Sequence, residues 1–218
     1  YDFSIKLYKE CCAYGVNMQY ASSASVYGDS KNFNEDGECR PMNAYAWSKY
    51  MFDRYVTTLD ICDKITLQGF RYFNVYGSNE EHKGEQASVF TKFRKQAITE
   101  TKIKLFENSD KYKRDFVCVD DVVNVHRLML SKSDSGIFNV GTGTATSFQR
   151  VADLCSNKLG VTIEYIEMPE NLKNQYQEYT RADNAKINSI LDLKWTTPKQ
   201  WIDANYNAVE DIRKSTST

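Results

Sequence analysis

The sequence predicts an α/β fold built on a parallel β-sheet. Short runs of β-branched and aromatic residues alternate with amphipathic helical stretches through most of the chain. The composition, with 41% hydrophobic and 26% charged residues, is that of an ordinary globular protein. A chain of 218 residues is long enough to bury a sizeable core without disulfides or a structural metal. No run approaches the ~18 apolar residues of a membrane span, and no secretory signal, internal repeat or low-complexity linker is visible.

The first elements lead to a strand that ends in hydroxylated residues. Residues 3–14 carry apolar side chains at helical spacing, and Gly15 follows as a C-terminal cap. The segment VNMQYASS, residues 16–23, predicts a short buried strand ending in small hydroxylated side chains, where a parallel strand presents residues to a site. A polar loop follows at 28–43, and a second helix begins near Ala44.

The alternation of strand and helix continues to the C-terminal end. The closing helix has a capping-box pattern, with Thr197 as the cap, Pro198 at the first helical position and Gln200 completing the box. The expected elements, in chain order, are the strand ITLQGFRYF (65–73), a helix at 86–99, the strand IKLF (103–106), the strand-to-helix passage RDFVCVDDVVNVHRLML (114–130), the strands GIFNVG (136–141) and VTIEYIEM (161–168), and the helix TTPKQWIDANYNAVEDI (196–212).

Charge and cysteine content exclude several classes of function. The net charge is −1, from 28 Lys+Arg and 29 Asp+Glu, so no global field attracts a nucleic-acid backbone. Six cysteines show no CxxC spacing, and only two histidines are present. We therefore expect buried or inert thiols in a reducing compartment, no metal site, and a cytoplasmic location.

Three residues form the sharpest chemical pattern of the sequence. Ser23 stands at a strand end, and 22 residues later Tyr45 and Lys49 stand four apart at a helix start. This spacing puts the phenol and the ammonium on one helix face, where the cation favours the phenolate. Ser23 could hydrogen-bond the substrate oxygen that Tyr45 protonates or deprotonates. The alternative is an exposed amphipathic pair without catalytic meaning.

Longer strings give this pattern a context. The triplet lies within ASSASVYG, NAYAWSK and FRYFNVYG, and RDFVCVDDV and FNVGTG follow later. From about Tyr1 to about Ile212 the chain resembles the extended short-chain dehydrogenase/reductase family of nucleotide-sugar epimerases and dehydratases. The resemblance implies a Rossmann-like parallel sheet with a smaller C-terminal substrate-binding α/β lobe. Residues 1–80 would belong to the NADP-binding domain and 81–218 mainly to the lobe, with segments near 115–145 returning to the first domain.

Departures from the family pattern indicate the branch. The dehydratases carry an Asp-Glu pair after the Ser or Thr, but this chain has Ala24 and Ser25, so we do not expect water elimination. The strings EHKGEQASV, KLFENSDKYKRDF and NLKNQYQEYTRAD are similar to the branch that epimerises an ADP-heptose. This resemblance implies that carbon six is inverted by NADP-mediated oxidation and reduction through a keto intermediate, supplying heptose for lipopolysaccharide. Homo-oligomers are implied as well.

The resemblance also implies roles for individual residues. Tyr45 and Lys83 would be opposite acid/base groups, Ser23 would assist Tyr45, and Lys49, Val75 and Lys83 would contact the cofactor, NADP or NAD. The implied substrate-binding set is Asn74, Glu85, Lys92, Phe106, Glu107, Asn108, Ser109, Arg114 and Tyr176. Glu85 replaces a small hydroxylated residue and Lys92 a histidine of the usual pattern. Without the resemblance, Lys83 would be a solvated loop lysine, and Phe106 and Tyr176 ordinary core residues.

Basic residues gather in the segment that holds most of these positions. Nine basic and four acidic residues lie between Lys83 and Arg114, a local charge of +5 against −6 for the remainder. This patch would suit a small nucleotide-diphosphate sugar, and Arg114 could donate two hydrogen bonds to a phosphate. A solvated charged face is the alternative.

The glycine-rich turn expected for a dinucleotide-binding domain is not found. The glycines of NVGTGTATS fall late in the chain and belong to the FNVGTG string, so they do not predict a phosphate loop. We expect that a first βαβαβ portion of roughly 90 residues precedes this segment. The strand at 16–23 would then have an open edge, and the 218 residues alone would be poorly stable and inactive.

Two other functions stay open at this point. One is another nucleotide-sugar epimerase, such as an enzyme that acts on carbon four of a UDP-hexose. The other is a non-catalytic relative that binds a nucleotide sugar.

Overall fold

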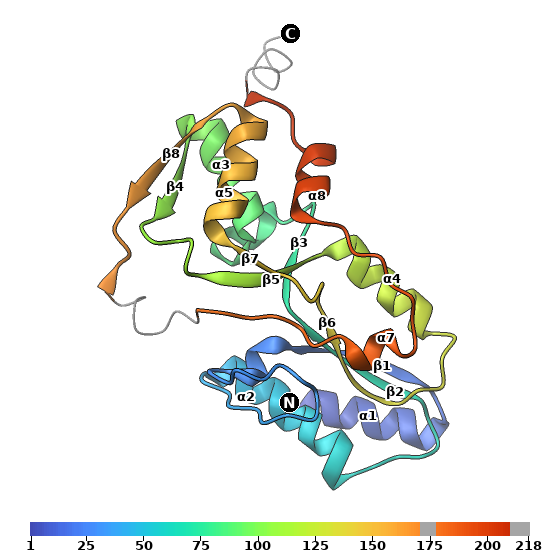
Figure 1. Cartoon of the computed structure of the whole chain (residues 1–218). Coiled ribbons are helices and arrows are strands. Elements are labelled where there is room, and N and C mark those ends of the chain that lie inside the picture. Colours follow the sequence, from blue (N-terminus) through green and yellow to red (C-terminus); the bar gives the residue numbers. More distant parts are fainter. Residues whose placement is uncertain (171–177, 210–218) are drawn as a thin grey trace. The chain divides into compact units, whose positions relative to one another are not determined.

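The computed structural model describes residues 1–170 and 178–209, and the chain divides into two compact units of similar length (Figure 1). The first unit contains residues 1–73, 123–143 and 181–193. The second contains residues 74–122 and 144–180, together with the chain from 194 onward. The separate roles predicted for residues 1–80 and 81–218 remain predictions. The return of residues 181–193 to the first unit was not predicted from the sequence.

The first unit is built on a parallel sheet, which confirms the predicted fold class. Its strands are β1 (Met18–Ser23), β2 (Leu67–Tyr72) and β6 (Gly136–Val140), in the order β1-β2-β6. The register places Ser23, Tyr72 and Val140 side by side, so the three carboxyl ends form one edge. Among the described residues β1 pairs only with β2, which agrees with the open edge predicted for this strand.

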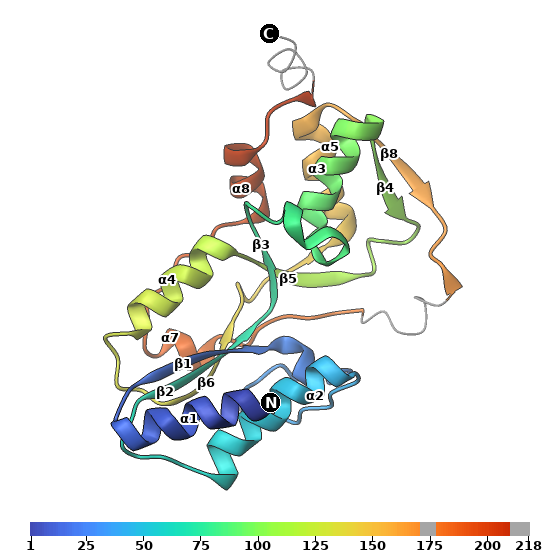
Figure 2. The same cartoon turned by 180° about the vertical axis from the view of Figure 1, so that it is seen from behind.

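Two helices pack on the same face of this sheet (Figure 2). Helix α1 (Asp2–Tyr14) ends at Gly15, whose φ of 67° is the left-handed conformation that glycine adopts without strain. Helix α2 (Ala44–Arg54) begins at Asn43, whose side chain accepts a hydrogen bond from the Ala46 N–H, and continues into a π-helical turn (Tyr55–Leu59). Tyr8, Phe52 and Val56 of these helices pack with Met18, Ile65 and Leu67. A 3₁₀ turn (Ala24–Tyr27) follows β1, and α7 (Ala185–Asn188) lies against β6.

The second unit contains two small sheets and a large apolar core. Strand β5 (Lys113–Cys118) pairs with β3 (Asn74–Tyr76) in parallel and with β7 (Ala145–Ser147) in antiparallel. Strand β4 (Lys102–Phe106) pairs in parallel with β8 (Thr162–Ile166). The helical elements are a 3₁₀ segment (Glu81–Gln86), α3 (Val89–Glu100), α5 (Phe148–Leu159) and α8 (Pro198–Asn205), whereas α4 (Val119–Met129) belongs partly to each unit.

Stacked aromatic rings occupy the centre of the second unit. Tyr76 and Phe90 are parallel with ring centroids 4.0 Å apart, and Phe116 and Trp201 meet Phe90 edge-on. The Tyr206 hydroxyl donates to the Phe90 carbonyl oxygen at 2.8 Å. Aromatic pairs of this kind add to the stabilisation that burial alone provides.

Two differences from the predicted elements have local causes. Helix α5 was not predicted, although Phe148, Val151, Cys155 and Leu159 have helical spacing between the Ser147 cap and Gly160. The closing helix was predicted to continue to Ile212, but α8 ends at Asn205 because Tyr206 is extended and its ring is buried in the core. The capping box of Thr197 and Gln200 is confirmed. In the described ranges, no helix is long and apolar enough to cross a membrane.

Candidate active site

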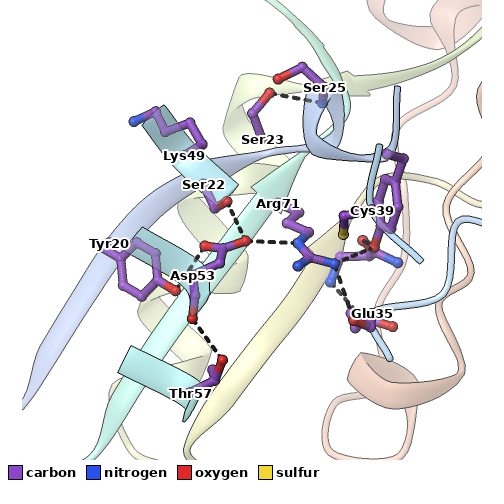
Figure 3. Close-up of polar contacts among 12 residues, drawn as sticks. Tyr20, Ser22, Ser23, Ser25, Glu35, Cys39, Lys49, Asp53, Thr57 and Arg71 are labelled. Atoms are coloured by element: carbon purple, nitrogen blue, oxygen red, sulfur yellow. Dashed lines mark hydrogen bonds and ion pairs between the residues drawn. The ribbon is translucent and has the colours of Figure 1, made fainter. Parts of the chain in front are cut away.

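Ser23 lies where the sequence places it, at the carboxyl end of β1. Its side-chain oxygen accepts the Ser25 N–H at 3.2 Å and caps the 3₁₀ turn that follows (Figure 3). The Ser25 hydroxyl nearby is buried and has no hydrogen-bond partner in the described structure. Two hydroxyls therefore meet at the edge where the parallel strands end, which is the usual ligand-binding edge of such sheets.

Tyr45 and Lys49 share one face of α2, as their spacing predicts. The Tyr45 side chain is 56% exposed, and the Lys49 ammonium lies 5.8 Å from the centre of the Tyr45 ring. Lys49 Nζ also donates to the carbonyl oxygen of Ala21 in β1 at 2.9 Å. The ammonium thus joins helix α2 to the strand that carries Ser23, and all three side chains belong to the first unit.

A buried polar network beside this triad was not predicted from the sequence. Asp53, on α2 one turn after Lys49, accepts hydrogen bonds from Tyr20 at 3.0 Å and Ser22 at 2.9 Å, both in β1 (Figure 3). Arg71 of β2 forms an ion pair with the same carboxylate at 3.0 Å. The signal that could have revealed Asp53 is a carboxylate next to Phe52 in the apolar stripe of the helix.

The network continues from Arg71 into the loop before α2 and into β6. Arg71 Nη1 donates to the Tyr27 hydroxyl at 3.1 Å and to the Glu35 carbonyl at 3.2 Å. The Tyr27 hydroxyl in turn donates to Asn139 Oδ1, and the Asn139 N–H donates to the Glu35 carboxylate. Burial raises the pKa of the Asp53 carboxyl, and the Arg71 guanidinium opposes that shift. Each of these buried polar groups has a partner, so the network is structurally well satisfied.

Lys83 lies in the second unit, where it forms an ion pair with Glu80. Its Nζ is 3.1 Å from an oxygen of Glu80, and the Lys83 side chain is 44% exposed whereas that of Glu80 is 6% exposed. Glu80 also accepts hydrogen bonds from Ser88 and Thr91. Burial raises the pKa of the Glu80 carboxyl, but the bonds from Ser88, Lys83 and Thr91 outweigh it and hold this pKa below 4.5. The anchor of Lys83 is therefore a charged carboxylate.

Four residues of the predicted substrate-binding set line one pocket of the second unit. Glu85, Lys92, Phe106 and Ser109 surround a volume of about 400 Å³, together with apolar side chains of α3, α5 and β8. Glu85 and Lys92, the two departures from the family pattern, contact each other. Lys92 Nζ lies 2.7 Å from the Glu85 carbonyl oxygen and 3.7 Å from its carboxylate. This pairing offsets the negative charge that Glu85 brings to the pocket.

The other members of the predicted set that lie in the described ranges do not line this pocket. Asn74 is exposed at the start of β3, next to the half-buried Val75. Glu107 and Asn108 are exposed in the turn after β4. Arg114 is only 8% exposed, and its guanidinium lies 5.5 Å from the centre of the Phe148 ring. Tyr176 lies outside the described residues.

Carboxylates partly neutralise the basic segment between Lys83 and Arg114. Lys104 pairs with Glu100 at 2.7 Å inside the segment, and Lys102 pairs with Glu164 of β8 at 2.7 Å. Glu100 is already counted in the local charge of +5, so of these two carboxylates only Glu164 lowers the charge of the segment in space. In the parts of the chain that the structure covers, no cluster of three His, Cys, Asp or Glu side chains could hold a metal ion.

Comparisons with known proteins identify the family of this chain. A model described as "NAD dependent epimerase/dehydratase family" matches residues 2–141. ADP-L-glycero-D-manno-heptose-6-epimerase of Thiobacillus denitrificans is 43% identical over 210 residues, covering 86% of this chain and 63% of that protein. The protein of the same name from Brachyspira hyodysenteriae is 42% identical over 193 residues, covering 86% of this chain and 61% of that protein.

A solved structure agrees with the sequence relatives. The crystal structure of Helicobacter pylori ADP-L-glycero-D-manno-heptose-6-epimerase aligns with a TM-score of 0.81 at 27% identity, covering 100% of this chain and 65% of that one. The chain spans somewhat more than three fifths of the length of the curated relatives that it matches, 63% and 61%.

Proposed function

Because the chain belongs to the NAD dependent epimerase/dehydratase family, we propose that it forms part of an epimerase that inverts carbon six of ADP-D-glycero-D-manno-heptose. The product would be ADP-L-glycero-D-manno-heptose, a precursor of lipopolysaccharide heptose. The observation that carries this proposal is the placement of Ser23, Tyr45 and Lys49 around the end of β1, in a chain 43% identical to a protein of that name.

The cofactor of the proposal is NADP, with NAD as the other candidate. When bound, the nicotinamide ring supplies a reversible hydride acceptor. The residues present fit such a group, because an ammonium has three N–H donors and the contacts described for Lys49 use one of them, on Ala21. The remaining donors suit ribose hydroxyls, and Val75 is the proposed apolar contact. The family establishes nicotinamide dependence, and the choice of NADP is part of the proposal.

Tyr45 and Ser23 would handle the proton of the substrate hydroxyl. The exposed Tyr45 would act as a phenolate that the Lys49 ammonium stabilises, and it would take the hydroxyl proton and become a phenol as carbon six gives up its hydride to the cofactor and becomes a ketone. The Ser23 hydroxyl donates to the developing carbonyl oxygen. Lys83 would transfer the proton for the opposite epimer, and Glu80 would hold its ammonium in place.

The pocket beside α3 is the proposed binding site for part of the nucleotide sugar. Phe106 and the other apolar side chains that line it provide a surface for a flat ring, while Lys92 and Ser109 offer polar contacts at the rim. Asn74, Glu85, Glu107, Asn108, Arg114 and Tyr176 remain in the proposed substrate-binding set. The cytoplasmic location and the homo-oligomer also remain predictions.

The test is product analysis with the protein as the cell makes it. We expect NMR to show interconversion of the two ADP-heptose epimers and no conversion of UDP-glucose. Tyr45→Phe should lower turnover by about 10²–10⁴-fold, whereas Tyr50→Phe on the same helix should not. Conversion of UDP-glucose instead would favour the hexose epimerase, and binding without any conversion would favour a non-catalytic relative. Assaying the 218 residues alone tests the prediction that they are inactive.

A matched pair of lysines tests the two-base hypothesis. Lys83→Ala should cripple epimerisation, and Lys95→Ala, an exposed lysine of α3, serves as the control. Full turnover of Lys83→Ala would refute the role of Lys83.

A further inference from the structure

We propose that Asp53 is a positioning residue, whose buried carboxylate holds α2 against β1 so that Tyr45 and Ser23 keep their relative placement. The inference rests on the function proposed above. It concerns a side chain that lies below the surface and touches neither substrate nor cofactor. The clasp defined by Asp53, Tyr20, Ser22 and Arg71 is drawn in Figure 3.

The first step of the argument is the geometry of the helix. Tyr45, Lys49 and Asp53 follow one another at intervals of four residues, so they lie along one side of α2. The first two are at the end of the helix that meets the sheet edge, and Asp53, which is 1% exposed, lies one turn after Lys49 and two turns after Tyr45. A fixed Asp53 therefore fixes the direction of the helix that carries Tyr45.

The second step is the geometry of the strand. Tyr20 and Ser22 are two residues apart in β1 and so point to the same face, where both hydroxyls reach Asp53. Ser23 is the next residue and ends the strand. A shift of α2 along or away from β1 that moved Tyr45 relative to Ser23 would therefore also stretch both hydrogen bonds.

The third step is the arrangement that lets Tyr20 reach Asp53. Tyr20 is paired in register with Gly69 of β2, and its ring lies directly over this residue. A Cβ at position 69 would be 2.4 Å from the Tyr20 hydroxyl oxygen, closer than atoms approach. Glycine at this position therefore leaves room for the phenol to lie across the strand. Arg71 then holds the carboxylate from the other strand at 3.0 Å.

The test removes one hydroxyl at a time from the clasp and leaves the Asp53–Arg71 ion pair intact. Tyr20→Phe keeps the ring contact with Phe52, whose centroid is 4.8 Å away, and so preserves the packing. Tyr55→Phe is the matched control, because it also removes a tyrosine–aspartate hydrogen bond, of 2.8 Å to Asp60, near the end of the same helix. Gly69→Ala provides a second route, since it displaces the Tyr20 hydroxyl.

Steady-state kinetics and hydrogen exchange supply the readouts. For Tyr20→Phe and Gly69→Ala we expect kcat for epimerisation to fall about 10- to 100-fold with KM within about two-fold, as misplacement of reacting groups predicts. Tyr55→Phe should keep the kcat of the unchanged protein. Unchanged kcat in Tyr20→Phe, or an equal loss in Tyr55→Phe, would overturn the proposal.

The hydrogen-exchange measurement does not depend on the proposed function. Amides of residues 44–54 should exchange faster in Tyr20→Phe than in Tyr55→Phe when no ligand is present. If the unchanged protein converts no nucleotide sugar, the proposed function fails, and the exchange rates still decide whether the clasp holds α2. Equal exchange of α2 in Tyr20→Phe, Tyr55→Phe and the unchanged protein would refute the clasp.

Discussion

Removing both partners of the buried Asp53–Arg71 ion pair should cost less stability than the sum of the losses from removing each partner alone. The side chains are 1% and 3% exposed, and their charged atoms are 3.0 Å apart. In Arg71→Met, the Asp53 carboxylate stays buried with only the hydroxyls of Tyr20 and Ser22 as partners. In Asp53→Leu, the guanidinium keeps its bonds to Tyr27 and Glu35 but loses its counter-charge.

The magnitude follows from the cost of an unpaired buried charge. Breaking a buried pair by removing one partner destabilises by about 3–5 kcal/mol, so two additive losses would total roughly 6–10 kcal/mol. The double variant Asp53→Leu/Arg71→Met leaves no unpaired charge. We expect its loss to be at least about 2 kcal/mol smaller than the sum of the single losses, a coupling typical of residues in direct contact.

Urea denaturation followed by circular dichroism measures these changes, and hydrogen exchange of the β2 amides reports the opening of the first unit. The exposed pair Lys199–Asp203, 2.5 Å apart, is the control, and Lys199→Met should leave the stability unchanged. Additive losses in the double variant would refute the reasoning, because they would mean that neither charge is stranded by the loss of the other.

Three further predictions concern the second unit. The pKa of Glu80 lies below its ordinary value of 4.5, so the charged carboxylate stabilises the fold above about pH 4.5, and this stabilisation is lost as the pH falls through the lower value. Glu80→Gln should therefore flatten the acid side of a plot of unfolding free energy against pH. An unchanged slope would contradict this. Thr197→Ala should cost about 0.5–2 kcal/mol in urea denaturation through loss of the α8 cap, and Thr197→Ser should restore most of it. Burial raises the pKa of the Cys155 thiol to about 12, so iodoacetamide should label the partly exposed Cys11 well before Cys155 in the native protein. Mass spectrometry measures the two labelling rates, and equal rates would contradict the prediction.

The sequence by itself determined the features that depend on near neighbours. Strand–helix alternation predicted the α/β class, and apolar spacing with caps located α1, α2 and α8. The four-residue spacing of Tyr45 and Lys49 placed both groups on one helix face, because the helical period is a local property of the backbone. Helix α5 was predictable by the same rule, from the spacing of Val151, Cys155 and Leu159.

The resemblance to the family predicted substrate-binding residues that the spacing of residues alone does not reveal. The four pocket residues Glu85, Lys92, Phe106 and Ser109 come from three separate segments, and no period in the sequence relates them. Their inclusion in one predicted set came from the resemblance, and the structure brings them together. The contact between Glu85 and Lys92, the two departures from the family pattern, does not follow from the sequence.

Only the tertiary structure decided which charged groups meet. Asp53 and Arg71 are 18 positions apart, and their pairing depends on α2 packing across β1 and β2. Glu80 similarly becomes a buried anchor for Lys83 through the turn that brings Ser88 and Thr91 to the same carboxylate. Local propensity sets the direction of a side chain within its own element. The partner of a buried charge is set by the packing of elements, because the low dielectric of the interior penalises every arrangement that leaves the charge alone.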